Sequence, residues 1–335
     1  MNQTYDHYIA VDWAQANMAI ARMTGKTHRI VTIDVRADVK ELQLYLSRLQ
    51  GSKILTIEET TTSQWLYSEL RSSVDDLIVC DPYRNHLLQE GAKSDRIDAE
   101  KLVQLLRANL LKPVFHTGDT FIYLRKFVSG YEDVVKAGVR LKNQRAALFR
   151  AVGKNKNETT LEHSAEKFVL EGLDQGIEAY EKEKGRYEEE FGRVTKKYLA
   201  VKNLDTLPGL GPINATKIAA IVVDPRRFQD RGHFLSYCGL IKLEKISGGK
   251  SYGKKNPRCC RILRGVFKTA AFSIIAKGEN KKNPLNNYYH YLIQEKHYSP
   301  HTATSALARR IAVLAYGILK TGKKFNPEIL KCKNQ

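Results

Sequence analysis

The first eighty residues alternate short apolar runs with polar connections, a pattern that predicts strands and covering helices. Three runs predict strands at residues 7–12, 18–23 and 28–35, and Thr24-Gly25-Lys26 suits the turn between the last two. The pattern then predicts a helix over 39–49, a strand over 54–57, a helix around 64–70, a strand over 76–80 and a helix opening at Pro82. Hairpin strands followed by alternating helices and strands predict a mixed α/β sheet, in the order that RNase H-like domains use.

The rest of the chain predicts helices. Residues 120–152 are helical throughout, and a three-four alternation from Leu170 to Tyr198 has heptad register with a polar interruption at Lys184. This alternation predicts a coiled coil or paired long helices, and an amphipathic helix packed within its own chain fits it equally well. Residues 303–319 predict an apolar core helix. We therefore expect three regions: an α/β domain over 1–115, long helices over 116–200 and a mainly α C-terminal domain over 201–335.

The charge of the chain points to a polyanionic partner. Its 335 residues carry a formal net charge of +19, for which nucleic acid is the commonest explanation and a merely solubilising basic surface is the alternative. No apolar run approaches the ~20 residues that span a membrane, and no apolar signal segment opens the chain. The five cysteines lack both metal-site spacing and the density of a disulfide scaffold. We therefore expect a cytoplasmic protein with reduced thiols and no membrane partner.

Four acidic residues stand at positions that predict a metal site. Asp12 ends the first predicted strand and Glu58 ends the fourth, and these strands would be neighbours in an RNase H-like sheet. Asp95 and Asp98 are three residues apart at the start of an apolar-periodic helix, so both carboxylates project from one face. Four such acids can hold two Mg²⁺ or Mn²⁺ ions ~3.5–4 Å apart, which suits phosphoryl transfer. For each acid alone, a solvated surface carboxylate is the alternative.

Two glycine-containing stretches in the C-terminal region predict contacts with a phosphodiester backbone. Gly209 and Gly211 lie in a Pro-Gly-x-Gly turn that opens a helix, which is the helix-hairpin-helix signature, although such turns also cap ordinary helices. Ser247 precedes two glycines in a stretch that predicts a loop, where a plain turn serine is the alternative to a functional one. Cations follow on the loop and on the next helix: Lys250, Lys254, Lys255, Arg258, Arg261 and Arg264.

Motifs in both halves of the chain resemble those of one family. The N-terminal ones are Ile9-Ala10-Val11-Asp12, Ile57-Glu58-x-Thr60 and Lys93-Ser94-Asp95-x-x-Asp98-Ala99. The C-terminal ones are Leu207-Pro208-Gly209-Leu210-Gly211, Cys238-Gly239-Leu240 and Ser247-Gly248. In this order they resemble the bridge-RNA-guided insertion-sequence transposases, DEDD recombinases related to the pilin-gene invertases. The resemblance runs nearly end to end.

The resemblance implies an RNA-guided DNA recombinase with a RuvC-like N-terminal domain. Asp12, Glu58, Asp95 and Asp98 would bind Mg²⁺, and Ser247 would attack DNA to give a phosphoserine link. A structured non-coding RNA would pair with donor and target double-stranded DNA. The implied assembly is a homodimer or tetramer in which the serine of one subunit completes the metal site of another, associated with a bacterial or archaeal nucleoid.

Two positions depart from the family pattern. Glu59 stands where the family has a small residue; strand alternation directs only one of Glu58 and Glu59 toward the metals, and the motif selects Glu58. The segment after the serine is longer in the family and contains a Ser-Lys pair, whereas here it reads Gly253-Lys254-Lys255-Asn256-Pro257. Ser251 lies close to Ser247 and is a second candidate nucleophile. The alternative enzyme is a RuvC-like junction nuclease or transposase that uses water and forms no serine adduct. A non-catalytic nucleic-acid-binding protein is the third possibility.

Overall fold

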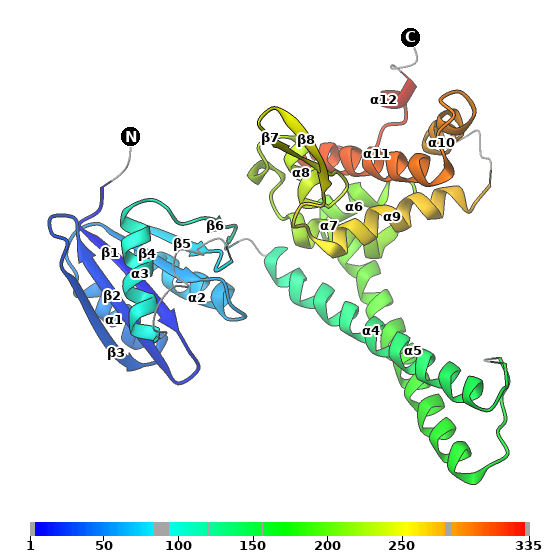
Figure 1. The fold of residues 1–335 in the computed structure, drawn as a ribbon, viewed down its shortest axis with the longest axis horizontal. Helices are drawn as coiled ribbons and strands as arrows, with labels where there is room; N and C mark the ends of the chain where they lie inside the picture. The colour runs from blue at the N-terminus through cyan, green and yellow to red at the C-terminus, as the bar shows by residue number, and fades with distance from the viewer. Residues whose placement is uncertain (1–3, 84–93, 119–120, 156, 279–282, 332–335) are drawn as a thin grey trace. The chain divides into compact units, whose positions relative to one another are not determined.

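The computed structural model describes residues 4–83, 94–118, 121–155, 157–278 and 283–331, which belong to two compact units (Figure 1). The N-terminal unit ends at Gly118, and the C-terminal unit takes in the rest of the chain. The long helices expected over 116–200 share this second unit with the helices of 201–335, whereas the sequence analysis expected two separate regions there. The helix predicted to open at Pro82 falls largely on residues 84–93, which lie outside the described residues.

A six-stranded mixed sheet in the order β3-β2-β1-β4-β5-β6 forms the centre of the N-terminal unit. Its strands are β1 (His7–Trp13), β2 (Asn17–Thr24), β3 (Ile30–Arg36), β4 (Lys53–Glu58), β5 (Asp76–Cys80) and β6 (Pro113–Val114). The first three strands pair antiparallel, β4 runs parallel to both β1 and β5, and β6 pairs antiparallel with β5. This confirms the predicted mixed sheet and the adjacency of the first and fourth strands, and it is compatible with an RNase H-like nuclease fold.

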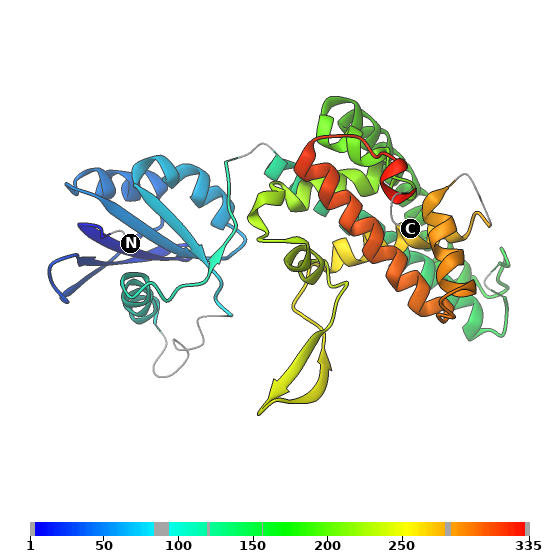
Figure 2. The same ribbon diagram turned by 90° about the horizontal axis from the view of Figure 1, so that it is seen from above.

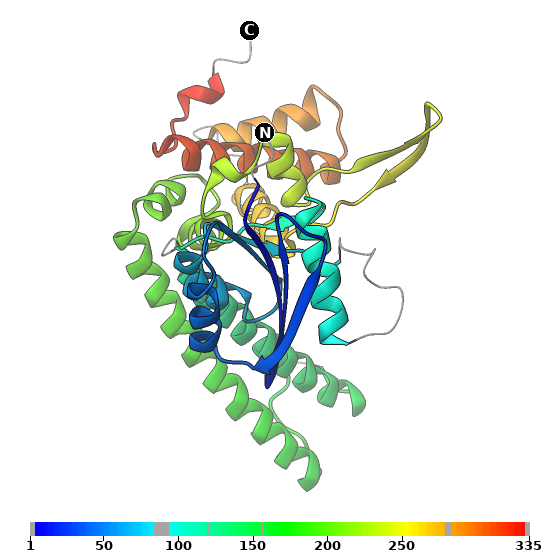
Figure 3. The same ribbon diagram turned by 90° about the vertical axis from the view of Figure 1, so that its left-hand side faces the viewer.

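Helices cover both faces of this sheet, and strand alternation sorts the side chains between them. The bounds are α1 (Val39–Ser47), α2 (Ser63–Leu70) with the 3₁₀ turn η1 (Arg71–Ser73), and α3 (Asp95–Arg107). Helices α1 and α2 lie on one face and α3 lies on the other (Figure 3). Ile9 and Val11 are buried with α1 and α2, whereas Ala10 is buried with α3. Within one strand, residues with odd numbers and residues with even numbers therefore lie on opposite faces, and we refer to this as the parity of a residue.

Two long helices, α4 (Phe121–Ala151) and α5 (Ser164–Lys197), run antiparallel and side by side (Figures 1 and 3). The ring of Phe127 on α4 lies 5.3 Å from that of Tyr187 and 4.6 Å from that of Phe191, both on α5. Lys184, the polar interruption, forms an ion pair of 3.4 Å with Glu188 on its own helix. The structure thus shows paired long helices packed within one chain, and a coiled coil between chains stays a prediction.

The remaining helices of the C-terminal unit share one hydrophobic core, in which most residues of α7 are buried. They are α6 (Leu199–Asp205), α7 (Gly211–Val222), η3 (Pro225–Arg227), α8 (Arg231–Tyr237), α9 (Arg261–Ile275), α10 (Pro284–Gln294), α11 (Pro300–Thr321) and α12 (Glu328–Lys331). The predicted core helix over 303–319 is confirmed as part of α11. Arg125 of α4 donates to the carbonyl oxygens of Ala220 and Ile221 at 3.1 and 3.2 Å, which ties the long helices to the end of α7.

A β-hairpin made of β7 (Leu243–Ser247) and β8 (Lys250–Lys255) projects from these helices (Figure 2). Every residue of both strands is exposed. Gly248 and Gly249 have φ angles of 55° and 75°, the left-handed conformation that a two-residue hairpin turn needs at both positions. The loop predicted for this glycine-rich stretch is therefore wrong: the two glycines form a tight turn that lets the flanking residues pair as strands.

Cys238, Cys259 and Cys260 are free thiols, and Cys80 and Cys238 are buried. This agrees with the absence of a disulfide framework in the sequence. Within the described ranges, no helix combines the length and the apolar character that crossing a membrane requires.

Candidate functional site

Two of the predicted acids lie at neighbouring strand ends on one face of the sheet. Asp12 has the parity of Ala10, which is buried with α3, so its side chain leaves β1 on the α3 face. Glu58 is the last residue of β4 and has the parity of Ile54, which is buried on the same face. Because β1 and β4 are paired parallel neighbours, the two carboxyl groups lie at the same edge.

The other two acids occupy the first turn of α3. Ser94 caps the helix, and its Oγ accepts a hydrogen bond of 3.3 Å from the backbone N–H of Ile97. Asp95 and Asp98 lie on the same stripe as Leu102, which is buried against the sheet. The stripe therefore presents both carboxylates on the side of α3 that faces the sheet, and the helix N-terminus favours their negative charge.

The four carboxyl groups act on one another electrostatically. Burial, followed by the charges of Asp95 and Asp98, raises the pKa of Asp12 to about 6. Burial, followed by the charges of Asp12 and Asp98, raises the pKa of Glu58. In the described part of the chain, no lysine, arginine or histidine forms an ion pair with any of the four. We call Asp12, Glu58, Asp95 and Asp98 the acidic cluster; among the described residues, no side-chain cation pairs with them to offset their repulsion.

The acidic cluster fits a hard divalent cation by its chemistry. All its donors are carboxylate oxygens, which Mg²⁺ and Mn²⁺ prefer and zinc does not. In the residues that the structure describes, however, no three Asp, Glu, His or Cys side chains lie close enough together to hold a metal ion as they stand. A bound ion would have to draw the carboxylates together. Its positive charge would offset the repulsion between carboxylates that, together with burial, raises the pKa of Asp12 and Glu58. Metal binding here stays a prediction.

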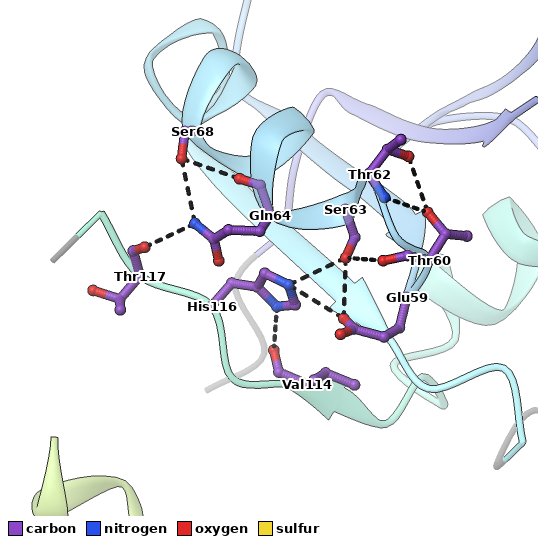
Figure 4. A network of polar contacts seen from close by, with 9 residues as sticks. All are labelled: Glu59, Thr60, Thr62, Ser63, Gln64, Ser68, Val114, His116 and Thr117. Atoms are coloured by element: carbon purple, nitrogen blue, oxygen red, sulfur yellow. Dashed lines mark hydrogen bonds and ion pairs between the residues drawn. The ribbon is translucent and has the colours of Figure 1, made fainter. Parts of the chain in front are cut away.

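Glu59, the alternative to Glu58, takes part in a separate polar network (Figure 4). Its carboxylate lies 3.2 Å from Nε2 of His116 and accepts a hydrogen bond of 3.3 Å from Oγ of Ser63. The His116 side chain is 4% exposed, and its Nδ1 lies 3.3 Å from the carbonyl oxygen of Val114. The network joins the end of β4 to the start of α2 and to the segment after β6. Of the two glutamates, Glu58 is therefore the one that belongs to the acidic cluster.

This network was missed at the level of the sequence. Ser63 and His116 are 53 residues apart, so no local spacing connects them. Ser63 is 1% exposed and also donates to the carbonyl of Thr60 at 2.9 Å. A serine so deeply buried is a structural partner of Glu59 and not an accessible nucleophile.

The two candidate nucleophiles lie on opposite faces of the hairpin. Ser247 pairs with Lys250 across the turn, and Ile246 pairs with Ser251. Directly opposite residues share a face, and successive residues alternate, so Ser247 and Ser251 point to different sides. Tyr252, which the sequence analysis did not single out, has the parity of Lys250 and is 69% exposed. An exposed aromatic in a basic run was the available signal, because such rings stack on bases.

The predicted basic residues are at the surface, with one exception. Lys250, Lys254 and Lys255 are exposed on β8, and Arg258 and Arg261 are exposed before and at the start of α9. Arg264 is half-buried, and its Cδ would lie 3.2 Å from a Cβ placed on Gly239. The hairpin and the start of α9 thus present a continuous stretch of basic sequence to solvent, and the acids belong to the other unit.

The two glycines of the turn between α6 and α7 differ in what surrounds them. Gly209 and Gly211 have φ angles of 89° and 68°. A Cβ on Gly209 would lie 2.6 Å from the carbonyl oxygen of Ala270 in α9, whereas a Cβ on Gly211 would meet nothing within 4 Å. Gly209 therefore serves close packing of the turn against α9. Gly211 has open space beside it, and the helix-hairpin-helix role of this turn stays a prediction.

We expect Gly209→Ala to destabilise the C-terminal unit by about 2–4 kcal/mol, because it adds a backbone clash to the strain of a positive φ. Gly211→Ala is the matched control, since it adds strain alone, and should cost about 1 kcal/mol. Urea unfolding of the full chain, followed by circular dichroism, measures both. Equal midpoints for the two variants would contradict the packing role of Gly209.

A mixed sheet with four acids, two of them at strand ends and two on the helix covering that face, is compatible with the DEDD class of nuclease-like transposase domains. Two family models agree with this class. Residues 9–153 match the DEDD transposase domain of the IS110 type, and residues 201–290 match the transposase IS116/IS110/IS902 family. The chain belongs to the IS110/IS116 family of insertion-sequence transposases.

Individual relatives are distant. The chain is 29% identical over 126 residues to the "Insertion element IS116 uncharacterized 44.8 kDa protein" of Streptomyces clavuligerus, covering 37% of this chain and 30% of that protein. It is 22% identical over 160 residues to the "Probable family 20 transposase" of Pseudomonas aeruginosa, covering 48% of this chain and 47% of that protein. The chain thus spans less than half the length of each of these relatives.

Proposed function

We propose that this protein is a DNA transposase that cleaves and exchanges strands at the ends of an insertion sequence. The observation that supports this most is the acidic cluster, where burial and neighbouring carboxylates raise the pKa of Asp12 and Glu58 within the domain that matches DEDD transposases. The net charge of +19 favours double-stranded DNA, donor and target, as the substrate.

In this proposal the acidic cluster holds one or two Mg²⁺ or Mn²⁺ ions. Such ions, when bound, polarise a phosphate and neutralise charge on the leaving oxygen. The chain's own part is to hold the carboxyls in place. Asp12 and Glu58 extend from paired strands, and Asp95 and Asp98 from a capped helix turn. The contact of Glu59 with His116 anchors the end of β4 from the opposite face.

Ser247 is the proposed nucleophile. Its Oγ forms a bond to phosphorus while the P–O3′ bond breaks. The serine hydroxyl loses its proton and the leaving 3′ oxygen gains one, so the number of protons is unchanged. The phosphoserine link keeps one phosphodiester bond for each bond broken, so strands can be rejoined without an external energy source. The exposed position of Ser247 at the hairpin tip supports this role.

A nuclease or transposase that uses water is the second candidate. The acidic cluster favours it, because carboxylate-bound metal ions can activate water with no further nucleophile. Ser247 would then be an ordinary residue beside a glycine turn. The two candidates differ in whether DNA becomes covalently attached to the protein.

We also propose a structured non-coding RNA as guide and a homodimer or tetramer as the active assembly. The exposed basic residues of the hairpin and α9 support RNA binding without identifying it. The protein purified from cells that carry its insertion sequence should retain one discrete RNA, detected by sequencing the nucleic acid that copurifies. A mixture that mirrors the bulk cellular RNA would contradict the guided mechanism and leave the transposase proposal intact.

A further inference from the structure

The residue directly opposite Ser247 in the hairpin is Lys250. The two flank the Gly248-Gly249 turn as the last pair of the ladder. Directly opposite side chains on one face of an antiparallel pair have Cβ atoms about 4.5–5.5 Å apart. The hydroxyl of Ser247 and the flexible ammonium of Lys250 therefore leave the backbone from adjacent points on the same side of an exposed turn.

The cations of the hairpin are not equivalent. Lys254 lies opposite Glu244, and their charged groups are 3.9 Å apart. Lys255 lies opposite Leu243 in the pair farthest from the turn, and a register shift separates that end of the ladder from the pairs beside the turn. Lys250 has no ion pair or hydrogen bond from its side chain to the described residues. Of these three lysines, Lys250 is the one that stands directly opposite Ser247 and whose ammonium forms no ion pair with a carboxylate of the described residues.

We propose that Lys250 is a catalytic residue that binds a non-bridging oxygen of the phosphate attacked by Ser247. This inference rests on the proposed function, because it takes Ser247 as the nucleophile. A phosphate within reach of the Ser247 hydroxyl is also within reach of the Lys250 ammonium, which carries three donors on a flexible stem. In the attack, the Oγ–P bond forms, the P–O3′ bond breaks and the serine proton is balanced by protonation of O3′. The ammonium stabilises the added negative charge on the non-bridging oxygens throughout.

The turn gives this pair its positional accuracy. Both of its residues need a positive φ, which glycine adopts without strain, and a two-residue turn leaves no slack between the strands. The pair is therefore held in register although the hairpin is exposed on both faces. The remaining basic residues bind the DNA backbone at other phosphates and contribute to DNA affinity through their total charge.

The test compares Lys250→Ala with Lys255→Ala, which removes the same charge from the end of the hairpin farthest from the turn. Both should reduce the salt dependence of DNA binding by about one unit of slope. At saturating DNA, Lys250→Ala should lower the rate of covalent protein–DNA adduct formation by about 10²-fold, whereas Lys255→Ala should lower it by no more than about 3-fold. Lys250→Arg should recover part of the rate, because it restores a cation at the same place.

Ser247→Ala run alongside separates the two levels of the argument. If Ser247→Ala still forms the adduct, the proposed function is wrong. If Ser247→Ala forms none while Lys250→Ala and Lys255→Ala are equally slow, the role of Lys250 is wrong and the serine mechanism stands. A circular dichroism spectrum for each variant shows that the helices of the unit remain folded.

Discussion

Replacing Asp12 with asparagine should abolish strand cleavage and, in the metal-free protein, raise the midpoint of thermal unfolding. Cleavage should fall by at least about 10³-fold, since a ligand that holds the metal against the phosphate is lost. The stabilisation has a separate cause: Asp12 is a half-buried carboxyl next to two other carboxyls, with a pKa of about 6. Removing its charge should raise the free energy of unfolding by on the order of 1–2 kcal/mol, after a discount for solvent screening. This corresponds to a rise of a few degrees in the unfolding midpoint.

The pH dependence of this effect has a definite sign. The folded state holds the Asp12 proton up to a pKa of about 6, whereas the unfolded chain releases it near 3.8. The wild-type protein is therefore favoured at low pH, and loses this contribution as the pH rises from about 4 through 6. Asp12→Asn has no carboxyl to ionise and therefore keeps its stability over this range. In EDTA, the excess of its free energy of unfolding over that of the wild type should grow between pH 4 and pH 7 and then level off. Differential scanning calorimetry across this range measures it.

Asp34→Asn is the matched control, because Asp34 is an exposed carboxyl on β3 that pairs with Arg96 at 4.0 Å. Its removal should leave cleavage unchanged and cost at most about 0.5 kcal/mol. If Asp12→Asn is less stable than wild type in EDTA, the repulsion within the acidic cluster is contradicted. If it cleaves normally with Mg²⁺, the metal site is contradicted.

Replacing Ser247 with alanine should remove covalent attachment of DNA to the protein, a loss of at least about 10³-fold. The measurement uses end-labelled insertion-sequence DNA and denaturing gels, on which a protein–DNA adduct migrates separately from free cleaved strands. The substitution is at an exposed hairpin tip, so folding should be unaffected.

Ser251→Ala is the control that the geometry supplies, because Ser251 is exposed on the same hairpin but faces the other side. It should retain adduct formation within about 3-fold of wild type. If Ser251→Ala forms no adduct and Ser247→Ala still forms it, Ser251 is the nucleophile and Ser247 is not. Free cleaved strands from Ser247→Ala at the wild-type rate would favour the mechanism that uses water.

The local patterns of the sequence predicted most of the N-terminal unit. Short apolar runs predicted β1, β2, β3, β4 and β5, and Asp95 and Asp98 marked the start of α3. These features are local, since strand and helix periodicity depend only on neighbouring residues. The hairpin was missed because the same Gly-Gly signal suits an open loop or a tight turn, and only pairing of the flanking residues distinguishes the two.

The sequence by itself determined that this chain carries acids at two strand ends and on one helix face, a serine amid cations and a large positive charge. The tertiary structure alone decided that Glu58 joins the acidic cluster while Glu59 contacts His116, and that Ser247 shares a face with Lys250 while Ser251 does not. It also decided that Gly209 packs against Ala270. The physical reason is that each of these choices depends on a partner strand or on a residue far away in the chain, which no local spacing contains.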